Sequence, residues 1–246
     1  MSIGQVAEAV GTSEATVSRF ARHAGFDDFK SLKQALMNEE LEEGPAKKLS
    51  TTIVSGNGGL FRAFMEKQET NILRTLENAR HEDIDKAVSL MENAARIFIY
   101  AKNASSSLAI LLEYRLKRLS LDVHIIKTIP EGLAGLKKGD TVIIFSFSKL
   151  SAEASVILDY AGKEGIKTIL FTSKLYLGEN EKGDVNLYVY RGEAGEFHSS
   201  SAPAAFVDAL VLCLSAQLGE KAVSSLEKLD RLKETYRKKL AEVQAR

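Results

Sequence analysis

The chain has 246 residues, 45% of them hydrophobic and 27% charged, which suits a globular protein with one small domain and one of ordinary size. Lysine plus arginine and aspartate plus glutamate balance at 33 each, so net charge points to no particular partner. No signal peptide opens the chain and its apolar runs are too short or too interrupted to span a bilayer, which predicts a cytoplasmic protein. The single cysteine, Cys213, excludes an intramolecular disulfide, and its apolar neighbours predict a buried thiol.

Residues 6–20, VAEAVGTSEATVSRF, predict two short helices joined by a tight turn. Gly11 is the residue type with which a helix readily ends in the left-handed conformation, and Ser13 offers a hydroxyl to cap the next helix. The small side chain of Ala7 allows the two helices to cross closely. Apolar residues share one face of each helix, namely Val6, Ala7 and Val10 in the first and Val17 and Phe20 in the second. The polar residues expected to face outward are Ser13, Glu14, Ser18, Arg19 and Arg22.

The order A-x-x-x-G-x-S-x-x-T-V-S-R-F-x-x-x-x-G-F-x-x-F-x-x-L-K resembles the DNA-binding domain of the RpiR family of transcriptional regulators. The matching positions are Ala7, Gly11, Ser13, Thr16, Val17, Arg19, Gly25, Phe26, Phe29 and Leu32. The resemblance implies a helix-turn-helix whose second helix enters the major groove of double-stranded operator DNA. The candidate DNA contacts are Ser13, Glu14, Thr16, Ser18, Arg19 and Arg22. The alternative is an ordinary pair of packed helices.

Three segments are expected along the chain. Residues 1–43 are expected to form the small all-α DNA-binding domain. The resemblance implies that this domain is N-terminally shortened, since the family has one or more helices before this motif. Residues 44–59 combine Gly44-Pro45, a basic pair and a glycine cluster, which predicts a linker. Residues 60–246 form the second domain, whose last segment, 220–246, is a charged helix with one apolar stripe. Such a stripe packs on its own domain or on a partner subunit.

Apolar runs rich in β-forming residues alternate with helical patterns in the second domain. The strands are expected at 96–101, 122–127, 139–148, 166–173 and 184–190. Strands that alternate with helices of this length predict a parallel sheet covered on both faces.

Two strand-to-helix junctions are rich in hydroxyls, AKNASSS at 101–107 and FSFSKLSAE at 145–153. Ligands of open α/β sheets bind beyond the carboxyl ends of the strands, where serine hydroxyls and backbone N–H groups suit a phosphate. The alternative is that Ser105, Ser148 and Ser151 only cap their helices.

Together these loops resemble the sugar isomerase (SIS) domain, which in the RpiR family follows the DNA-binding domain and senses phosphosugars. Residues 146–151 match the family's S-x-S-G-x-[ST] turn, residues 101–105 stand at its G-x-G-S-S turn, and 196–214 resembles its late helix through Ser201, Asp208 and Leu210. The resemblance implies a three-layer α/β/α fold with a five-stranded, mainly parallel sheet. The phosphosugar-binding candidates are Asn103, Ser105, Ser146, Ser148, Lys149 and Ser151.

Three family glycines are replaced, by Ala101, Asn103 and Lys149. Glycine permits positive φ angles, which asparagine tolerates and alanine and lysine adopt poorly. Two hypotheses follow. Lys102 and Lys149 add positive charge and shift the site toward a more anionic ligand, or Lys149 fills the site and the effector has been lost or changed.

Some SIS proteins isomerise or cleave phosphosugars, so an enzyme is the alternative function. A general base would have to come from Glu153, Glu193, Glu196 or His198. The four histidines are scattered, so neither a metal site nor a cofactor is expected. The helix-turn-helix favours a regulator without catalytic residues, which binds operator DNA as a homodimer or homotetramer and senses a phosphorylated sugar.

Overall fold

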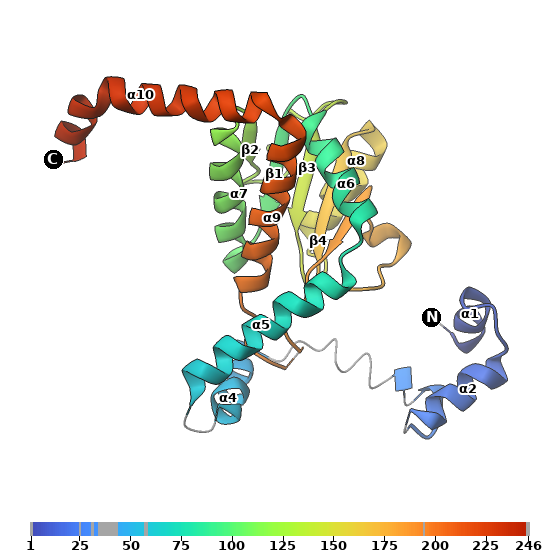
Figure 1. Ribbon diagram of the computed structural model, residues 1–246. Coiled ribbons are helices and arrows are strands. Elements are labelled where there is room, and N and C mark those ends of the chain that lie inside the picture. The colour runs from blue at the N-terminus through green and yellow to red at the C-terminus, as the bar shows by residue number, and fades with distance from the viewer. Residues whose placement is uncertain are drawn as a thin grey trace. The chain divides into compact units, whose positions relative to one another are not determined.

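The computed structural model describes residues 2–24, 26–30, 32–33, 44–56, 59–193 and 195–244. The chain divides into two compact units (Figure 1), one of Met1–Leu60 with Glu193–Phe197 and one of Phe61–Gly192 with His198–Arg246. The domain bounds 1–43 and 60–246 stay predictions, and Gly25 of the helix-turn-helix pattern lies outside the described residues.

Two short helices, α1 (Ile3–Ala9) and α2 (Glu14–His23), open the first unit. Each is capped by a serine, Ser2 or Ser13, whose hydroxyl oxygen accepts the backbone N–H of the third residue of its helix at 3.2 Å. These hydroxyls satisfy N–H groups that have no partner inside the helix, so both helix starts are fixed by their own sequence.

The turn between α1 and α2 depends on Gly11, whose φ is +66°. The backbone N–H of Thr12 donates to the Ala7 carbonyl at 2.8 Å, and that of Gly11 donates to the Glu8 carbonyl at 3.2 Å. These are the two hydrogen bonds of a Schellman motif, which ends a helix and reverses the chain. The turn predicted at Gly11 is therefore confirmed.

Replacing Gly11 with alanine is expected to lower the opening free energy of the α1–α2 pair by about 1 kcal/mol, because a Cβ is strained at this positive φ. Native-state hydrogen exchange of the α1 and α2 amides in the full chain measures this free energy. Gly11→Asn is the control and should lose less, since asparagine tolerates left-handed backbone. Equal protection in Gly11→Ala and the parent chain would contradict the assignment.

The crossing of α1 and α2 buries small residues, as the sequence predicts. Ala7, Val17 and Ala21 are buried, whereas Val10 and Phe20 are 65% and 63% exposed. Ala7 and Val17 thus lie in the interface as predicted, whereas Val10 and Phe20 do not. Helices of only seven and ten residues share a narrow contact.

The predicted linker contains a helix, α4 (Pro45–Ser55). Gly44 stands at its N-cap and Pro45 in its first turn, where a missing N–H costs nothing. The linker prediction rests on Gly44-Pro45, the basic pair and the glycine cluster, and the first two of these residues instead begin a helix. The backbone N–H of Phe197 donates to the Thr52 hydroxyl at 2.9 Å, which ties the 193–197 segment to α4 within the first unit.

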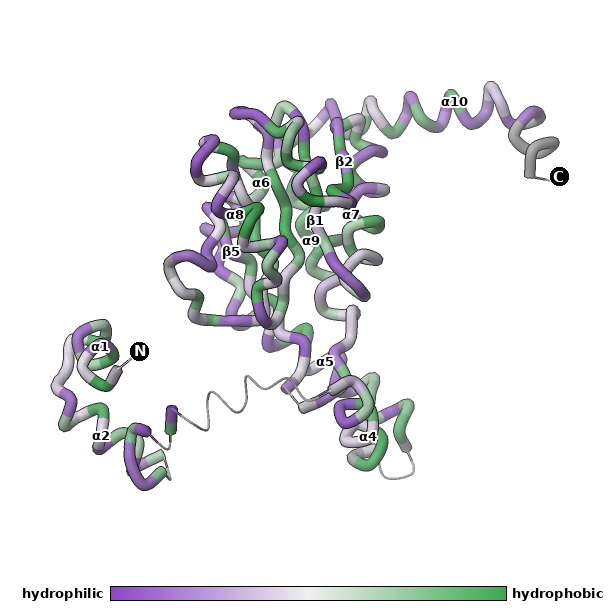
Figure 2. Tube along the Cα trace, turned by 180° about the vertical axis from the view of Figure 1, so that it is seen from behind, coloured by the Kyte–Doolittle hydropathy of each residue, from purple (hydrophilic) through white to green (hydrophobic). Residues whose placement is uncertain are grey.

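The second unit is built on five strands in the order β2-β1-β3-β4-β5, and every neighbouring pair is parallel. This confirms the predicted five-stranded parallel sheet. The strands are β1 (Ile97–Ala101), β2 (Val123–Ile125), β3 (Thr141–Phe145), β4 (Lys167–Thr172) and β5 (Val185–Tyr188). All five residues of the central strand β3 are buried, and Figure 2 shows β1 as a hydrophobic segment.

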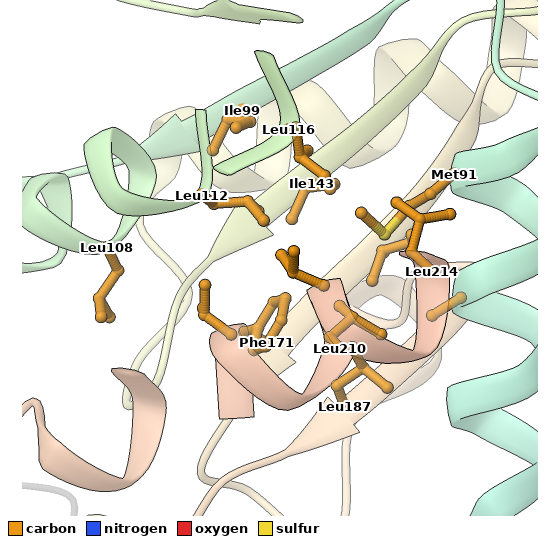
Figure 3. Close-up of a cluster of buried hydrophobic side chains, with 14 of the residues drawn as sticks. Met91, Ile99, Leu108, Leu112, Leu116, Ile143, Phe171, Leu187, Leu210 and Leu214 are labelled. Atoms are coloured by element: carbon orange, nitrogen blue, oxygen red, sulfur yellow. The ribbon is translucent and has the colours of Figure 1, made fainter. Parts of the chain in front are cut away.

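Helices cover both faces of the sheet, which confirms the three-layer α/β/α architecture. One face packs on α6 (His81–Glu92), α7 (Ser106–Arg118) and α9 (Ser201–Leu218), and the other packs on α8 (Ala152–Glu164). Figure 3 shows the first of these cores, in which strand and helix side chains interlock. The labelled residues there are Met91, Ile99, Leu108, Leu112, Leu116, Ile143, Phe171, Leu187, Leu210 and Leu214.

Cys213 is exposed, which corrects the prediction of a buried thiol. It lies on α9, whose buried stripe of Val207, Leu210 and Leu214 faces the sheet, while Leu212 and Cys213 turn away from it. α9 is long and apolar enough to span a membrane by length and composition, but its buried side chains belong to the core of this unit. Because the outer face of α9 is apolar as well, the apolar neighbours of Cys213 in the sequence wrongly indicated that it is buried.

Two further long helices complete the unit, α5 (Leu60–Asn78) and α10 (Glu220–Gln244). α10 extends away from the sheet (Figure 1) and leaves Val223, Leu232 and Tyr236 about half exposed, at 58%, 48% and 49%. Two short 3-10 turns, Asn103–Ser105 and Glu179–Glu181, lie in the loops.

A buried ion pair holds the amino ends of β1 and β3 together. Asp140 is fully buried and accepts hydrogen bonds from Arg96 Nε at 3.0 Å, from an Arg96 terminal nitrogen at 2.6 Å and from the Lys137 N–H at 2.9 Å. Burial alone would raise the pKa of Asp140, but the Arg96 and Lys137 hydrogen bonds hold it below its usual value.

Candidate functional site

The strand order changes direction between β1 and β3. From β1 the chain crosses to β2 on one side, and from β3 it continues to β4 and β5 on the other. The carboxyl ends of the two strands at such a switch point form the usual ligand crevice of an open α/β sheet. The hydroxyl-rich loops predicted from the sequence, 101–107 and 145–153, leave from these two strands.

The loop after β1 keeps a left-handed residue where the family has a glycine. Asn103 has a φ of +55°, whereas the φ angles of Ala101 and Lys149 are not positive. Asparagine tolerates this conformation, so all three glycine replacements are accommodated without backbone strain.

The serines of the two loops have different roles. Ser151 caps α8, since its hydroxyl oxygen accepts the Ala154 N–H at 3.2 Å, so the capping alternative holds for this residue. Ser105 makes no capping hydrogen bond. Ser148 is exposed, with no side-chain hydrogen bond to the described residues, and Ser146 donates only a long bond of 3.5 Å to the Lys149 carbonyl. Ser105 and Ser148 therefore offer their hydroxyls to a ligand.

An ion pair bridges the two loops. Lys102 Nζ lies 2.5 Å from Glu153 Oε1, across 51 positions of sequence. The hydrogen bond from Lys102, with those from the Glu153 backbone and Ser151, lowers the pKa of Glu153 to about 2, and the pKa of Lys102 is raised. A carboxylate with so low a pKa is a weak general base at neutral pH.

The pair also changes which cations remain for an anionic ligand. Glu153 compensates Lys102, so Lys102 adds little net charge to the site. Lys149 is exposed and forms no ion pair with the residues described. Of the two lysines that the sequence assigned to the site, only Lys149 is therefore available to an anion without breaking a protein contact.

The other candidate bases fall in different parts of the chain. Glu193 and Glu196 belong to the first unit, where the Glu193 N–H donates to Glu196 Oε2 at 3.0 Å, while His198 belongs to the second. Asp208 of the late helix pairs with Arg115 Nε at 3.1 Å and joins α9 to α7.

Arg191 lies beside the candidate phosphate loop, and sequence analysis did not single it out. It follows β5 by three positions, and its guanidinium carbon lies 4.5 Å from the ring centroid of Phe147, the residue between Ser146 and Ser148. The sequence signal that could have identified Arg191 is its position directly after the last expected strand, 184–190.

The outer face of α2 carries the predicted DNA contacts. Ser13, Thr16 and Arg19 are exposed and connected, since the Ser13 and Thr16 hydroxyls lie 3.0 Å apart and an Arg19 terminal nitrogen donates to Thr16 Oγ1 at 3.3 Å. An Arg22 terminal nitrogen donates to the half-buried Ser18 at 3.5 Å. Glu14, in the first turn, is exposed as well.

Known proteins resemble this chain over most of its length. It is 26% identical over 239 residues to an HTH-type transcriptional regulator of Caldanaerobacter subterraneus subsp. tengcongensis, a match covering 92% of this chain and 83% of the relative. NanR of Vibrio vulnificus, solved with ManNAc-6P, is 19% identical with a TM-score of 0.65 and covers 95% of this chain and 85% of its own.

Matches that cover about two thirds of this chain point to one fold. The sugar isomerase domain of an RpiR transcription factor from Sphaerobacter thermophilus is 22% identical, covers 68% of this chain and 96% of its own, and has a TM-score of 0.63. A Methanococcus jannaschii protein whose structure infers a 3-hexulose-6-phosphate isomerase function has a TM-score of 0.53 at 18% identity, covering 68% of this chain and 96% of its own. The family model of the SIS domain matches residues 90–212, half of the chain, and the chain therefore belongs to the SIS domain family.

Proposed function

We propose that this chain is a transcriptional regulator that binds operator DNA through α2 and senses a phosphorylated sugar at the carboxyl ends of β1 and β3. One observation carries the proposal, namely that a serine-capped helix pair and a switch-point site with uncommitted hydroxyls occur in the same chain. The similarity to an HTH-type transcriptional regulator over 92% of the chain supports it. Such a protein works in the cytoplasm, where it meets its operator.

The phosphate binds to the loop after β3. The hydroxyls of Ser146 and Ser148, the α8 N-terminus capped by Ser151 and the ammonium of Lys149 supply donors and positive charge. Asn103 and Ser105, in the loop after β1, contact the sugar. The complex of NanR with ManNAc-6P gives this ligand class a precedent in the same fold.

The DNA is bound by a dimer or tetramer, because a symmetric operator requires two α2 helices. Exposed apolar residues on α10 and an apolar groove between α5 and α9, lined by Ile72, Leu76, Phe206 and Cys213 among others, supply surface for association. Sugar binding changes operator affinity to the extent that the sugar prefers one arrangement of the DNA-binding helices.

Replacing Ser148 with alanine tests the sugar site. Phosphosugar affinity, measured by calorimetry, is expected to fall about tenfold, because a charge-assisted hydrogen bond to phosphate is lost. Ser155→Ala, an exposed serine farther along α8, is the matched control and should retain the parent affinity. Equal affinities in the two variants would remove Ser148 from the site.

Lys149→Gly decides whether Lys149, which replaces a family glycine, adds positive charge for an anionic ligand or fills the site. If Lys149 donates to the phosphate, affinity falls about tenfold and the loss shrinks at high salt. A rise in affinity would show that the lysine obstructs the site. Both results are measured by titrating the full chain with the same phosphosugars.

A sugar-phosphate isomerase is the second candidate, because the Methanococcus jannaschii neighbour carries that inferred function on this fold. The low pKa of Glu153 speaks against it as the base. Interconversion of aldose and ketose phosphates, followed by NMR, discriminates the two functions, and measurable turnover would favour the enzyme.

A further inference from the structure

Arg191 lies beside the candidate phosphate loop but outside it. Its guanidinium covers the ring of Phe147, and its Nε donates to the Ser199 carbonyl at 3.3 Å, just before α9. Phe147 packs in the core cluster that contains α9, whereas α8, which follows the phosphate loop, packs on the opposite face of the sheet. Arg191 therefore approaches the carboxyl edge of the sheet from the α9 side.

The charge of Arg191 has no carboxylate partner in the part of the chain that the structure describes. The side chain is half-buried, forms no ion pair there, and leaves both terminal nitrogens without a hydrogen bond to the described residues. Burial lowers the pKa of its guanidinium. Other arginines of this unit that reach across the fold are paired, Arg96 with Asp140 and Arg115 with Asp208.

An arginine that is partly desolvated and unpaired is costly unless an anion joins it. Its two terminal nitrogens form the planar fork that matches a carboxylate in a bidentate pair. At the same edge Lys102 is compensated by Glu153. Lys149, two residues after Phe147, and Arg191, over the Phe147 ring, are therefore two separate cations that an effector can engage.

We propose that Arg191 binds a second anionic group of the effector, a carboxylate at the end of the sugar opposite its phosphate. The effector is then a phosphorylated sugar acid rather than a neutral sugar phosphate. This inference rests on the proposed function, because it takes the phosphate to bind at Ser146, Ser148 and Lys149.

Matched probes isolate the carboxylate. The 6-phosphates of glucose, mannose and galactose are each oxidised at C1 to the aldonate and reduced at C1 to the alditol, which keeps carbon number and phosphate the same. Calorimetry on the full chain is expected to show at least one aldonate 6-phosphate binding about tenfold tighter than its alditol, the effect of one charge-assisted pair. Equal binding of aldonate and alditol in every pair would overturn the inference and leave the phosphosugar function standing.

Variants assign the preference to Arg191. Arg191→Gln is expected to remove the difference between the two probes and to leave the alditol affinity within twofold. Arg118→Gln, which changes a half-buried arginine on α7, should retain the preference. A preference that survives Arg191→Gln would overturn the assignment. If the variant does not fold, the aldonate-to-alditol ratio of the parent chain still decides whether a carboxylate is recognised. Binding of none of the six probes would count against the proposed function and the inference together.

Discussion

Replacing Arg19 with alanine is expected to reduce specific DNA affinity by about ten- to a hundredfold, because one arginine contact to a base edge contributes about 1–3 kcal/mol. Arg19 is exposed on α2, and Thr16 Oγ1 accepts a hydrogen bond from it at 3.3 Å, which holds its side chain on the outer face. Fluorescence anisotropy with labelled operator DNA at fixed salt measures the change.

The control for this variant is Arg62→Ala, an arginine on α5 whose side chain is 87% exposed. It should leave DNA affinity within twofold, since it lies outside α2. The salt dependence separates two roles, because loss of a phosphate contact lowers the salt slope by about one, whereas loss of a base contact relaxes sequence preference. Parent-like affinity and preference in Arg19→Ala would contradict its role.

Replacing Asp140 with asparagine is expected to lower the free energy of unfolding of the second unit by about 3 kcal/mol, more than a hundredfold in the folding equilibrium. Asp140 is fully buried and accepts three hydrogen bonds, two of them from Arg96, so the change leaves a guanidinium without its carboxylate. Urea denaturation followed by circular dichroism measures the loss. Asp159→Asn, which breaks an exposed pair with Lys163, should cost less than about 1 kcal/mol.

The same variant should change the pH dependence of stability. The folded pKa of Asp140 lies below its ordinary value of 3.8, so its contribution is present above that pH and is lost as the pH falls through the folded value. Asp140→Asn should therefore flatten the fall in stability below pH 4. If the free energy of unfolding of Asp140→Asn falls as steeply below pH 4 as that of the parent chain, the pKa of Asp140 does not change on folding.

Local sequence signals found the parts of the fold that local physics determines. The strands β1 and β3 are short runs of β-forming apolar residues, and their burial between two helix layers explains why they lack alternation. The turn at Gly11 and the left-handed Asn103 follow from the few residue types that tolerate positive φ. The hydroxyl-rich loops could be placed at one edge of the sheet because parallel strands end on the same side.

Features that depend on tertiary arrangement could not be found in this way. The pairing of Lys102 with Glu153 joins residues 51 positions apart and requires β1 to lie beside β3, which only the strand order reveals. The contact of Arg191 with Phe147 has the same origin. The exposure of Cys213 depends on which face of an apolar helix meets the sheet. The helix α4 forms despite β-branched residues of low helix propensity.

The most direct test of a sugar-sensing regulator is the anisotropy of DNA from the gene's own upstream region, titrated with this chain at fixed salt, with and without a panel of phosphosugars. Specific binding that one phosphosugar changes at least tenfold is the predicted result. Specific binding that no phosphosugar alters would contradict the sensing role. Binding no tighter to upstream DNA than to unrelated DNA of the same length would contradict the regulator itself.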